Sequence, residues 1–521
     1  MNASPTAVTP TPGTAPGVRS VSVVIPTYNN LALLRECLRS VRDMDYPADR
    51  LEVTVVDNGS GDGTYRAVHM PELGVRCVRL EQNTGFAAAC NRGAAESSGD
   101  YVAFLNDDAL ADPQWLNQMF EALDDAEPGT VCVASRIMSR DGKEIEFNGA
   151  SSNLFGVGRP RSVWGWPDAP QPPGKGSPIL FASGGAMLVH RRTFLDVGGF
   201  DPNFFAYFED VDLGWRLWVL GHRVVYAPDA VVRHIGGATG TRQPAHRRYT
   251  LWECNSLATV LKNYESGNME RLLSGALLLL YKRALLAAGD ALQREDYNLG
   301  GPKDDNPANV ERLPRVSVAH LAAIDRFNSL LPVLMEERRR IQAARVRPDR
   351  EVLPLLGRLW EPQFAGSEYA AASRQMAAAL DLYGLTAEAL PNRVLVLAGP
   401  THDSATQVAS ALAAGFLVAL VRSQVGAAHT WGLDGGYTRH TLAPGAPELH
   451  ALVRHSDAVL VFPGALDGVP VEATDTPLAM LDAPSTGKLP GASYFQSADL
   501  GALREFCRRP VAPSSVPRHP A

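Results

Sequence analysis

Short apolar runs alternate with helix-like segments through roughly the first 240 residues, and this alternation constrains the fold more than any other feature. The runs at 21–28, 51–57 and 101–104 are rich in β-branched and aromatic residues, which is typical of strands. Segments with helical spacing of apolar residues, such as 31–41, separate them. Strands that alternate with helices in this way form a mostly parallel sheet with helices on both faces.

Polar residues stand directly after these predicted strands, where a parallel sheet binds its ligands. Asp57 ends the second run and leads into a turn rich in Gly, Asn and Ser. A carboxylate there could cap the turn, or it could accept hydrogen bonds from a base or a ribose. Asn83, Gly85 and Asn91 surround a predicted helix start, where backbone N–H groups favour a phosphate, although Gly85 could equally serve as a turn residue.

The stretch FLNDDA places Asp107 and Asp108 after Asn106, at the end of another apolar run. Adjacent carboxylates repel one another unless a cation or a hydrogen-bond donor lies between them. Mg²⁺ prefers a few carboxylate oxygens together with substrate phosphates, although a helix N-cap followed by a turn would use the same residues. His234, after the run AVVR, is either an ordinary loop histidine or, beside Asp108, a ligand for metal or phosphate.

A second block of interest covers residues 179–237. Gly184 and Gly185 interrupt an apolar strand, which fits either a bulge or the close approach of another molecule. Glu209 and Asp210 open a segment with helical spacing, where the helix dipole alone would favour acids. Aromatic residues around this pair would partly desolvate a carboxylate and raise its basicity, which suits a general base.

Composition excludes several classes of function. The net charge of −7 argues against nucleic-acid binding, and a hydrophobic share of 45% with 20% charged residues is that of a soluble globular protein. The six cysteines include no CxxC pair, so the sequence predicts neither a zinc site nor a disulfide framework, but reduced thiols in the cytoplasm. Residues 1–19 lack the apolar core of a signal peptide and are expected to form a disordered tail.

With 521 residues the chain is too long for one core, and further domains are expected beyond residue 260. Residues 261–390 are predicted to form a helical extension and linker, whose basic cluster at 338–347 is either a solvated helix end or a contact with anionic lipid. Residues 391–507 are predicted to form a small, half Rossmann-like α/β domain. It lacks a G-x-G-x-x-G loop and is therefore not expected to hold a second active site. Residues 508–521 are expected to be a disordered tail.

Seven motifs in this order resemble the family 2 inverting glycosyltransferases, especially the rhamnosyltransferase-like branch that decorates bacterial polysaccharides. They are VSVVIPTYNN, VVDNGSGDGT, NTGFAAACNRG, FLNDDA, GGAMLV, GGFDPNFFAYFEDVDLGWRL and the histidine after the last strand. The resemblance covers residues 20–260 and implies a catalytic domain with the GT-A fold. It also implies a nucleotide-diphosphate sugar donor, such as a UDP- or dTDP-sugar, and a divalent metal, Mg²⁺ or Mn²⁺.

The resemblance assigns roles to residues at the matching positions. The donor-binding set comprises Pro26, Thr27, Tyr28, Asp57, Asn83, Gly85, Asn91, Asn106 and Asp107. Asp108 is the expected metal ligand, with His234 as its partner, although Asn106 replaces the first acid of the family's D-x-D motif. Asp210 matches the catalytic base, and its neighbour Glu209 has the weaker claim. Gly184, Gly185 and Trp215 match the acceptor side.

The expected function is therefore inverting transfer of a hexose to a hydroxyl group in bacterial polysaccharide or glycoconjugate synthesis. The acceptor would be a glycan or a lipid-linked glycan, met in the cytoplasm or at the inner face of the membrane. The alternative is a catalytically inactive nucleotide-sugar-binding or scaffold protein on the same fold. A sugar nucleotidyltransferase fits less well, because it would carry a Gly-rich, Lys-containing loop where this chain has PTYNN. The sequence names neither the sugar nor the acceptor, and it leaves open whether the chain forms a homo-oligomer.

Overall fold

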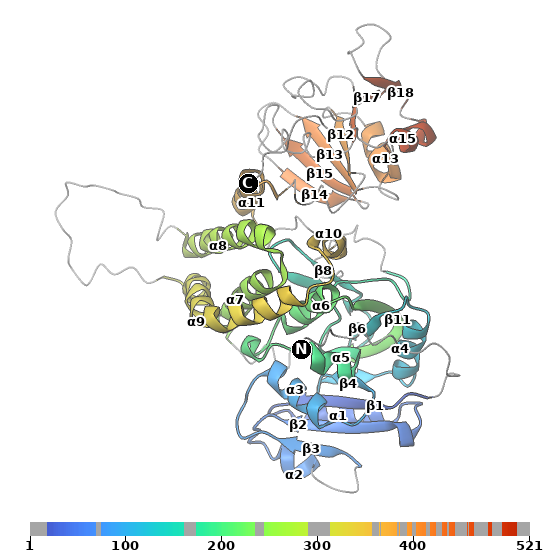
Figure 1. Ribbon diagram of the computed structural model, residues 1–521, viewed down its shortest axis with the longest axis vertical. Helices are drawn as coiled ribbons and strands as arrows, with labels where there is room; N and C mark the ends of the chain where they lie inside the picture. Colours follow the sequence, from blue (N-terminus) through green and yellow to red (C-terminus); the bar gives the residue numbers. More distant parts are fainter. Residues whose placement is uncertain are drawn as a thin grey trace, which may run out of the picture. The chain divides into compact units, whose positions relative to one another are not determined.

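The computed structural model describes residues 18–68, 74–160, 173–234, 244–289 and 313–356, and shorter segments between 364 and 507. Most of the predicted N-terminal tail and all of the C-terminal one lie outside these residues. The chain divides into two compact units, with the main boundary after Glu361 (Figure 1). Each unit is described separately below.

Within the described residues, the first unit is built on a nine-stranded sheet in the order β3-β2-β1-β4-β10-β6-β11-β5, with β7 paired to β6. Its first half is parallel and consists of β1 (Val21–Thr27), β2 (Leu51–Asp57), β3 (Arg76–Arg79) and β4 (Tyr101–Leu105). Every residue of β1 is buried, which explains its continuous apolar run. The parallel register pairs Thr27 with Asp57, so the polar residues after these strands meet at one edge of the sheet.

The second half of this sheet changes direction at β10, which is antiparallel to both of its neighbours. It contains β10 (Ala186–His190), β6 (Thr130–Ser139), β11 (Arg223–His234), β5 (Ala109–Ala111) and β7 (Ile145–Phe147). The antiparallel pairing of β11 with β5 sets His234 opposite Ala109. The histidine is thereby brought beside Asp108, although the two are far apart in the sequence.

Helices cover this sheet as predicted. They are α1 (Leu31–Arg42), α2 (Thr64–Val68), α3 (Phe86–Glu96), α4 (Trp115–Asp124), α5 (Arg191–Asp196) and α6 (Glu209–Val219). α3 packs closely on the sheet, because a Cβ atom at Gly93 would lie 2.3 Å from the Val24 side chain. A two-stranded sheet of β8 (Ala150–Ser152) and β9 (Gly158–Pro160) lies outside the main sheet. The arrangement confirms the expected GT-A-like α/β fold.

A helical region follows in the same unit (Figure 1). It contains α7 (Ala245–Asn263), α8 (Ser266–Ala288), α9 (Arg315–Ala343) and the short α10 (Asp349–Val352). A buried cluster joins the three long helices: Arg283 Nε donates to Glu253 Oε1 at 2.8 Å, and His320 Nδ1 lies 3.1 Å from the same oxygen. Among the described residues, no helix is long and apolar enough to cross a membrane.

The basic cluster at 338–347 is in part the solvated helix end that the sequence indicated, since the Arg339 side chain is exposed and pairs with Glu336, but other members of the cluster are buried or bound. Arg338 is buried and donates to the carbonyls of Leu261 and Tyr264, both at 2.6 Å. Arg347 donates to the carbonyls of Trp218 and His222. Backbone carbonyls at the ends of α7 and α6 have no N–H partner within their own helix. The guanidinium groups of Arg338 and Arg347 donate hydrogen bonds to them instead. The cluster thus fastens the helical region to the sheet domain.

The second unit, where described, holds a seven-stranded sheet in the order β14-β15-β13-β12-β16-β17-β18. Its strands are β12 (Arg393–Ala398), β13 (Leu417–Ser423), β14 (Thr430–Asp434), β15 (Tyr437–Leu442), β16 (Ala458–Val461), β17 (Leu478–Leu481) and β18 (Ser493–Phe495). All neighbours are parallel except β14 and β15. α13 (Asp403–Leu412) and α15 (Leu500–Cys507) contribute to its apolar core. A small α/β domain is therefore present, as expected.

Candidate active site

Asp57 is completely buried at the end of β2, and both of its oxygens have partners. Oδ1 accepts the Ser60 N–H at 2.9 Å, so the residue does cap the following turn. Oδ2 accepts Arg79 Nη1 at 3.2 Å, and the Arg79 guanidinium also lies over the ring of Tyr65. The sequence analysis did not identify Arg79. The feature that could have indicated Arg79 is a basic residue at the end of β3, the short strand that pairs with β2.

The loop from Asn83 to Gly85 is tied to Asn58. Asn58 Nδ2 donates to Asn83 Oδ1 at 3.1 Å and to the Gly85 carbonyl at 3.0 Å. One backbone N–H in the first turn of α3 already has a partner, because the Ala87 N–H donates to the Phe205 carbonyl at 3.3 Å. That contact joins the start of α3 to the loop that precedes Glu209.

Asn91 lies on α3, and both polar atoms of its amide group bind the backbone of Phe200. Its Nδ2 donates to the Phe200 carbonyl at 2.7 Å, and its Oδ1 accepts the Phe200 N–H at 2.9 Å. The side chain is therefore placed to hold the loop after α5. The donor role that the resemblance gave to Asn91 stays a prediction, since these two hydrogen bonds leave one N–H and one oxygen lone pair of the amide for a further partner.

Gly85 lies where this loop and the loop before Glu209 touch. Its φ is +89°, and a Cβ atom there would lie 2.4 Å from the Phe205 carbonyl oxygen. Only glycine suits both conditions. We expect Gly85→Ala to lower the free energy of unfolding by about 1–3 kcal/mol and to lower activity, because the loop before Glu209 must shift.

Gly63→Ala is the matched control for this prediction, because Gly63 has a φ of +87° and a Cβ atom there would meet no other atom within 4 Å. It carries the backbone strain without the steric contact. Denaturant unfolding and activity of both variants measure the difference. Equal losses in the two variants would show that the contact with Phe205 has no role of its own.

The adjacent acids Asp107 and Asp108 have different partners. Asp107 is buried and accepts Thr27 Oγ1 at 2.6 Å and Asn30 Nδ2 at 3.0 Å, so it fixes the β1–α1 turn. Pro26 precedes Thr27 within buried β1, whereas Tyr28 is exposed just beyond the strand.

Asp108 points toward the other half of the sheet. Its Oδ1 lies 3.1 Å from His234 Nε2, and Nδ1 of the same ring lies 2.7 Å from Glu146 Oε2. Burial alone would lower the pKa of His234, but the hydrogen bonds to both carboxylates outweigh it and raise the pKa to about 10. The ring is therefore a cation at neutral pH. The sequence predicted the Asp108–His234 pair but missed Glu146, which comes from β7.

In its protonated state His234 cannot ligate a metal, so a divalent metal bound by Asp108 would have to displace the Nε2 proton of the ring and would complete its ligands from the substrate. Two ligands at about 2.1 Å on adjacent octahedral positions would lie about 3 Å apart, close to the observed Asp108–His234 separation of 3.1 Å. In the described part of the chain, no group of three or more His, Cys, Asp or Glu side chains could hold a metal. Mg²⁺ is commonly bound by one or two protein ligands together with substrate phosphates.

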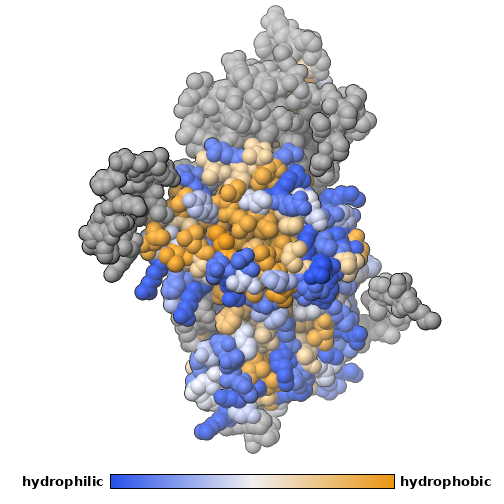
Figure 2. Space-filling model, turned by 60° about the vertical axis from the view of Figure 1, so that its left-hand side comes forward, coloured by the Kyte–Doolittle hydropathy of each residue, from blue (hydrophilic) through white to orange (hydrophobic). Residues whose placement is uncertain are grey.

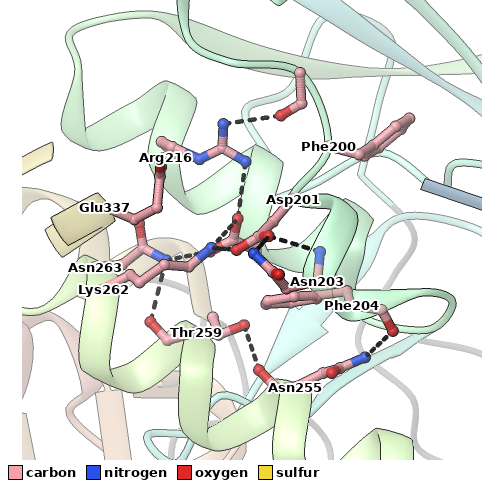
Figure 3. Close-up of polar contacts among 12 residues, drawn as sticks. Phe200, Asp201, Asn203, Phe204, Arg216, Asn255, Thr259, Lys262, Asn263 and Glu337 are labelled. Carbon is pink, nitrogen blue, oxygen red and sulfur yellow. Dashed lines mark hydrogen bonds and ion pairs between the residues drawn. The ribbon is translucent and has the colours of Figure 1, made fainter. Parts of the chain in front are cut away.

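Three left-handed residues precede Glu209 and Asp210. Phe205, Tyr207 and Phe208 have φ angles of 63°, 72° and 64°, which aromatic residues rarely adopt. Asn255 of α7 stabilises this turn, because its Nδ2 donates to the carbonyls of Ala206 and Tyr207 and, as Figure 3 shows, to that of Phe204. Conformational strain is therefore concentrated immediately before the acid pair.

Two backbone N–H groups donate hydrogen bonds to the carboxylate of Asp210. Its Oδ2 accepts the Gly184 N–H at 3.1 Å, and its Oδ1 accepts the Val211 N–H at 2.9 Å. Burial raises its pKa, while these hydrogen bonds oppose the shift. Gly184 thus touches the pair, and its neighbour Gly185 packs on the Asn106 side chain, where a Cβ atom would lie 2.9 Å from Nδ2.

Glu209 differs sharply from its neighbour. Burial, followed by the charge of Asp210, raises the pKa of Glu209 to about 8. Its Oε2 atom is buried, and no hydrogen-bond partner for it is found among the described residues. At neutral pH Glu209 therefore remains mainly protonated, and the charge of Asp210 contributes to this.

Trp215 lies one turn further along α6 and does not reach the site's surface. It is 1% exposed, and its ring packs edge-on against Tyr264 with a centroid separation of 4.8 Å. The side chain is part of the contact between α6 and the end of α7.

A buried charge network holds α6, α7 and the loop after α5 together (Figure 3). Lys262 Nζ lies 2.6 Å from Asp201 Oδ2 and 3.0 Å from Asp212 Oδ2. Arg216 Nη2 donates to Asp212 at 2.8 Å, and Arg216 Nη1 donates to the carbonyls of Val197 and Gly199. This network was not predicted from the sequence, and it fixes the helix that begins with the acid pair.

Comparisons with known proteins place the chain among the glycosyltransferases. Residues 22–197 match the family model described as glycosyl transferase family 2, and residues 173–254 match glycosyltransferase like family 2. An N-acetylglucosaminyl-diphospho-decaprenol L-rhamnosyltransferase of Mycobacterium tuberculosis is 34% identical over 215 residues, which cover 37% of this chain and 70% of that protein. A pre-mycofactocin glycosyltransferase of the same species is 32% identical over 232 residues, which cover 43% of this chain but only 44% of that protein.

Solved structures show weaker similarity. A mannosyltransferase from Pyrobaculum calidifontis, in complex with GDP-Man and Mn²⁺, is 21% identical with a TM-score of 0.37, covering 60% of this chain and 88% of that one. Staphylococcus aureus TarS gives a TM-score of 0.36 at 17% identity, covering 60% of this chain and 54% of that one.

Proposed function

Because the chain belongs to glycosyl transferase family 2, we propose that it transfers a hexose from a nucleoside-diphosphate sugar to an acceptor hydroxyl, with inversion at the anomeric carbon. The observation that carries this proposal is the acid pair at the start of α6. A carboxylate held by two N–H groups stands beside a protonated neighbour, at the edge of the sheet where Asp57 and Asp108 also lie. This is the environment that a general base requires.

The donor would lie along the carboxyl ends of β1, β2 and β4. Tyr28 and the Asp57–Arg79 pair would face the nucleoside, which we propose to be uridine or deoxythymidine. The diphosphate would lie toward Asp108 and His234, where a bound Mg²⁺ or Mn²⁺ would neutralise the leaving group. Asp107, Asn83 and Asn106 would hold the surrounding loops, as their hydrogen bonds and packing indicate.

Asp210 would accept the proton of the acceptor hydroxyl as that oxygen attacks the anomeric carbon. The N–H groups of Gly184 and Val211 orient its carboxylate, and Glu209 retains its own proton. A single displacement from the face opposite the nucleotide inverts the configuration. For the acceptor we propose a glycan or a lipid-linked glycan of bacterial polysaccharide synthesis, a class that includes the substrate named for the rhamnosyltransferase relative.

We also propose that the reaction takes place in the cytoplasm. All six cysteines lie within the described residues and are free thiols, which suits a reducing compartment.

The nucleotide site is tested by calorimetry with UDP and dTDP, with and without Mn²⁺. We expect Mn²⁺ to strengthen binding by at least about tenfold in the parent protein and to have little effect in Asp108→Ala, which removes one of the two protein ligands. The control is Asp125→Ala, which removes an exposed carboxylate whose partner in the described part of the chain is Lys175. Nucleotide binding that Mn²⁺ leaves unchanged in the parent protein would contradict the metal assignment.

A further inference from the structure

Large apolar side chains are exposed on the outer side of α8 and α9. Leu278 and Tyr281 of α8 are 55% and 52% exposed, and Val318 and Leu321 of α9 are 46% and 40% exposed. Figure 2, which brings the side of the molecule with these helices forward, shows hydrophobic residues gathered there into one broad area. We refer to these four residues and the surface between them as the α8–α9 face.

This face is not explained by packing within the helical region. α8 already buries Leu272, Leu279 and Leu280 on its inner side. The outward positions of the same helix remain apolar, so the helix is hydrophobic on more than one side. A contiguous apolar surface on a soluble protein marks a binding surface for another molecule. Since no described helix, α8 included, is long and apolar enough to cross a bilayer, contact with a membrane surface is the relevant membrane mode.

Cations stand closest to Tyr281 and Val318, and the nearest acids in the described parts of α8 and α9 are Glu270 and the exposed Asp325. Residues 271–289 and 313–324 contain no Asp or Glu, although the whole chain has a net charge of −7. The same two segments carry Lys282 and Arg315, which are not buried, next to the apolar positions. Cations beside exposed apolar residues are complementary to an anionic lipid surface. The arginine cluster at 338–347, which the sequence offered as the lipid contact, is committed largely to backbone carbonyls instead.

Aromatic rings lead from the loop before the acid pair to α9. Tyr207, two residues before Glu209, packs edge-on against Trp252 at 5.6 Å, and Trp252 packs in the same way against Tyr249 at 5.5 Å. Tyr249 in turn lies 5.7 Å from the ring of His320, whose neighbour in the chain is the exposed Leu321. The aromatic run therefore leads from the loop before the proposed base to His320, which is buried on α9 next to Leu321 in the chain.

We propose that the α8–α9 face docks on the surface of an anionic lipid bilayer. Leu278, Tyr281 and Leu321 enter the boundary between headgroups and acyl chains, while Lys282 and Arg315 contact the acidic headgroups. The docking itself is independent of the chemistry at the acid pair. One consequence of docking rests on the proposed function: a lipid-linked acceptor would reach the site along the aromatic run.

Flotation of the full chain with vesicles tests the proposal. We expect binding to vesicles of phosphatidylglycerol and phosphatidylcholine in equal parts, and much weaker binding to phosphatidylcholine alone. Leu278→Glu should reduce binding to the mixed vesicles by at least about tenfold, because it places a charge at the centre of the apolar contact. The matched control is Val346→Glu, since Val346 is 68% exposed outside this face and should be replaceable without loss.

Charge variants provide a second arm that does not alter the apolar surface. Lys282→Gln and Arg315→Gln should each weaken binding to the mixed vesicles about fivefold, with the effect fading at high salt. Circular dichroism melts confirm that each variant is folded. Release of nucleoside diphosphate in lipid-free solution should be unchanged in Leu278→Glu, which separates a failure of docking from a failure of the proposed function.

Three results would overturn the proposal. The first is a parent protein that binds neither kind of vesicle, or both equally. The second is a folded Leu278→Glu variant, or a pair of charge variants, that binds mixed vesicles as the parent does. The third is light scattering that shows a dimer of the parent protein and a monomer of Leu278→Glu without lipid, which would assign the face to a second copy of the chain.

Discussion

Asp210→Asn is expected to lower sugar transfer by roughly 10²- to 10⁴-fold with nearly unchanged nucleotide affinity. The substitution keeps the shape and the acceptor oxygen of the side chain but removes its basic form. Transfer rate and nucleotide affinity, measured side by side, check this result. A parallel loss of both quantities would show that Asp210 supports the donor site and is not the base.

Glu209→Gln is the matched control, because Glu209 is expected to be mainly protonated at neutral pH and its Oε2 has no partner among the described residues. Transfer should fall by less than about tenfold. The folded protein holds this proton more tightly than the unfolded chain, since the pKa rises from 4.5 to about 8. Glu209 therefore costs stability as the pH rises from about 4.5 to 8, and Glu209→Gln should gain stability relative to the parent over that window.

The pH dependence of transfer follows from the same pair. Burial raises the pKa of Asp210, and only its ionised form can accept a proton. Transfer should therefore fall as the pH is lowered through that raised pKa. The acidic limb should be absent from the residual activity of Asp210→Asn.

Lys262→Met is expected to lower the free energy of unfolding by about 3–5 kcal/mol. The Lys262 side chain is 1% exposed and its ammonium lies between Asp201 and Asp212, so its removal leaves two buried carboxylates without the cation that they share. Denaturant unfolding followed by circular dichroism measures the change. A loss below about 1 kcal/mol would show that the network contributes little to the fold.

Lys175→Met is the control for this substitution. Lys175 also pairs with two carboxylates, Glu121 and Asp125, but its side chain and theirs are exposed to solvent. Water screens such pairs, and the expected loss is within about 1 kcal/mol. The contrast between the two lysines isolates the effect of burial.

The fold of the first unit was predictable where its signals are local. Runs such as Val21–Thr27 are fully buried strands, and the polar residues that follow them meet at one edge of a parallel sheet. The antiparallel direction of β10 was not predictable from the residues, because the run AMLV suits either direction. The neighbouring strands β4 and β6 determine it.

The candidate site was predictable only in part. The Asp108–His234 pair was expected, and the pairing of β11 with β5 brings the two together. Glu146, Arg79 and Lys262 were missed because their roles depend on contacts between segments far apart in the sequence. The left-handed turn before Glu209 was also hidden, since phenylalanine and tyrosine do not favour that conformation and Asn255 of α7 holds it in place.

The most direct test of the account is release of nucleoside diphosphate from a panel of nucleotide sugars, measured for the parent protein and for Asp210→Asn with and without Mn²⁺. The account predicts Mn²⁺-dependent release from at least one UDP- or dTDP-sugar by the parent protein, rising with an added glycan or lipid-linked acceptor and falling at least about 100-fold in Asp210→Asn. Tight binding of the same nucleotide sugars with no release under any of these conditions would contradict it, and would identify the chain as an inactive nucleotide-sugar-binding protein.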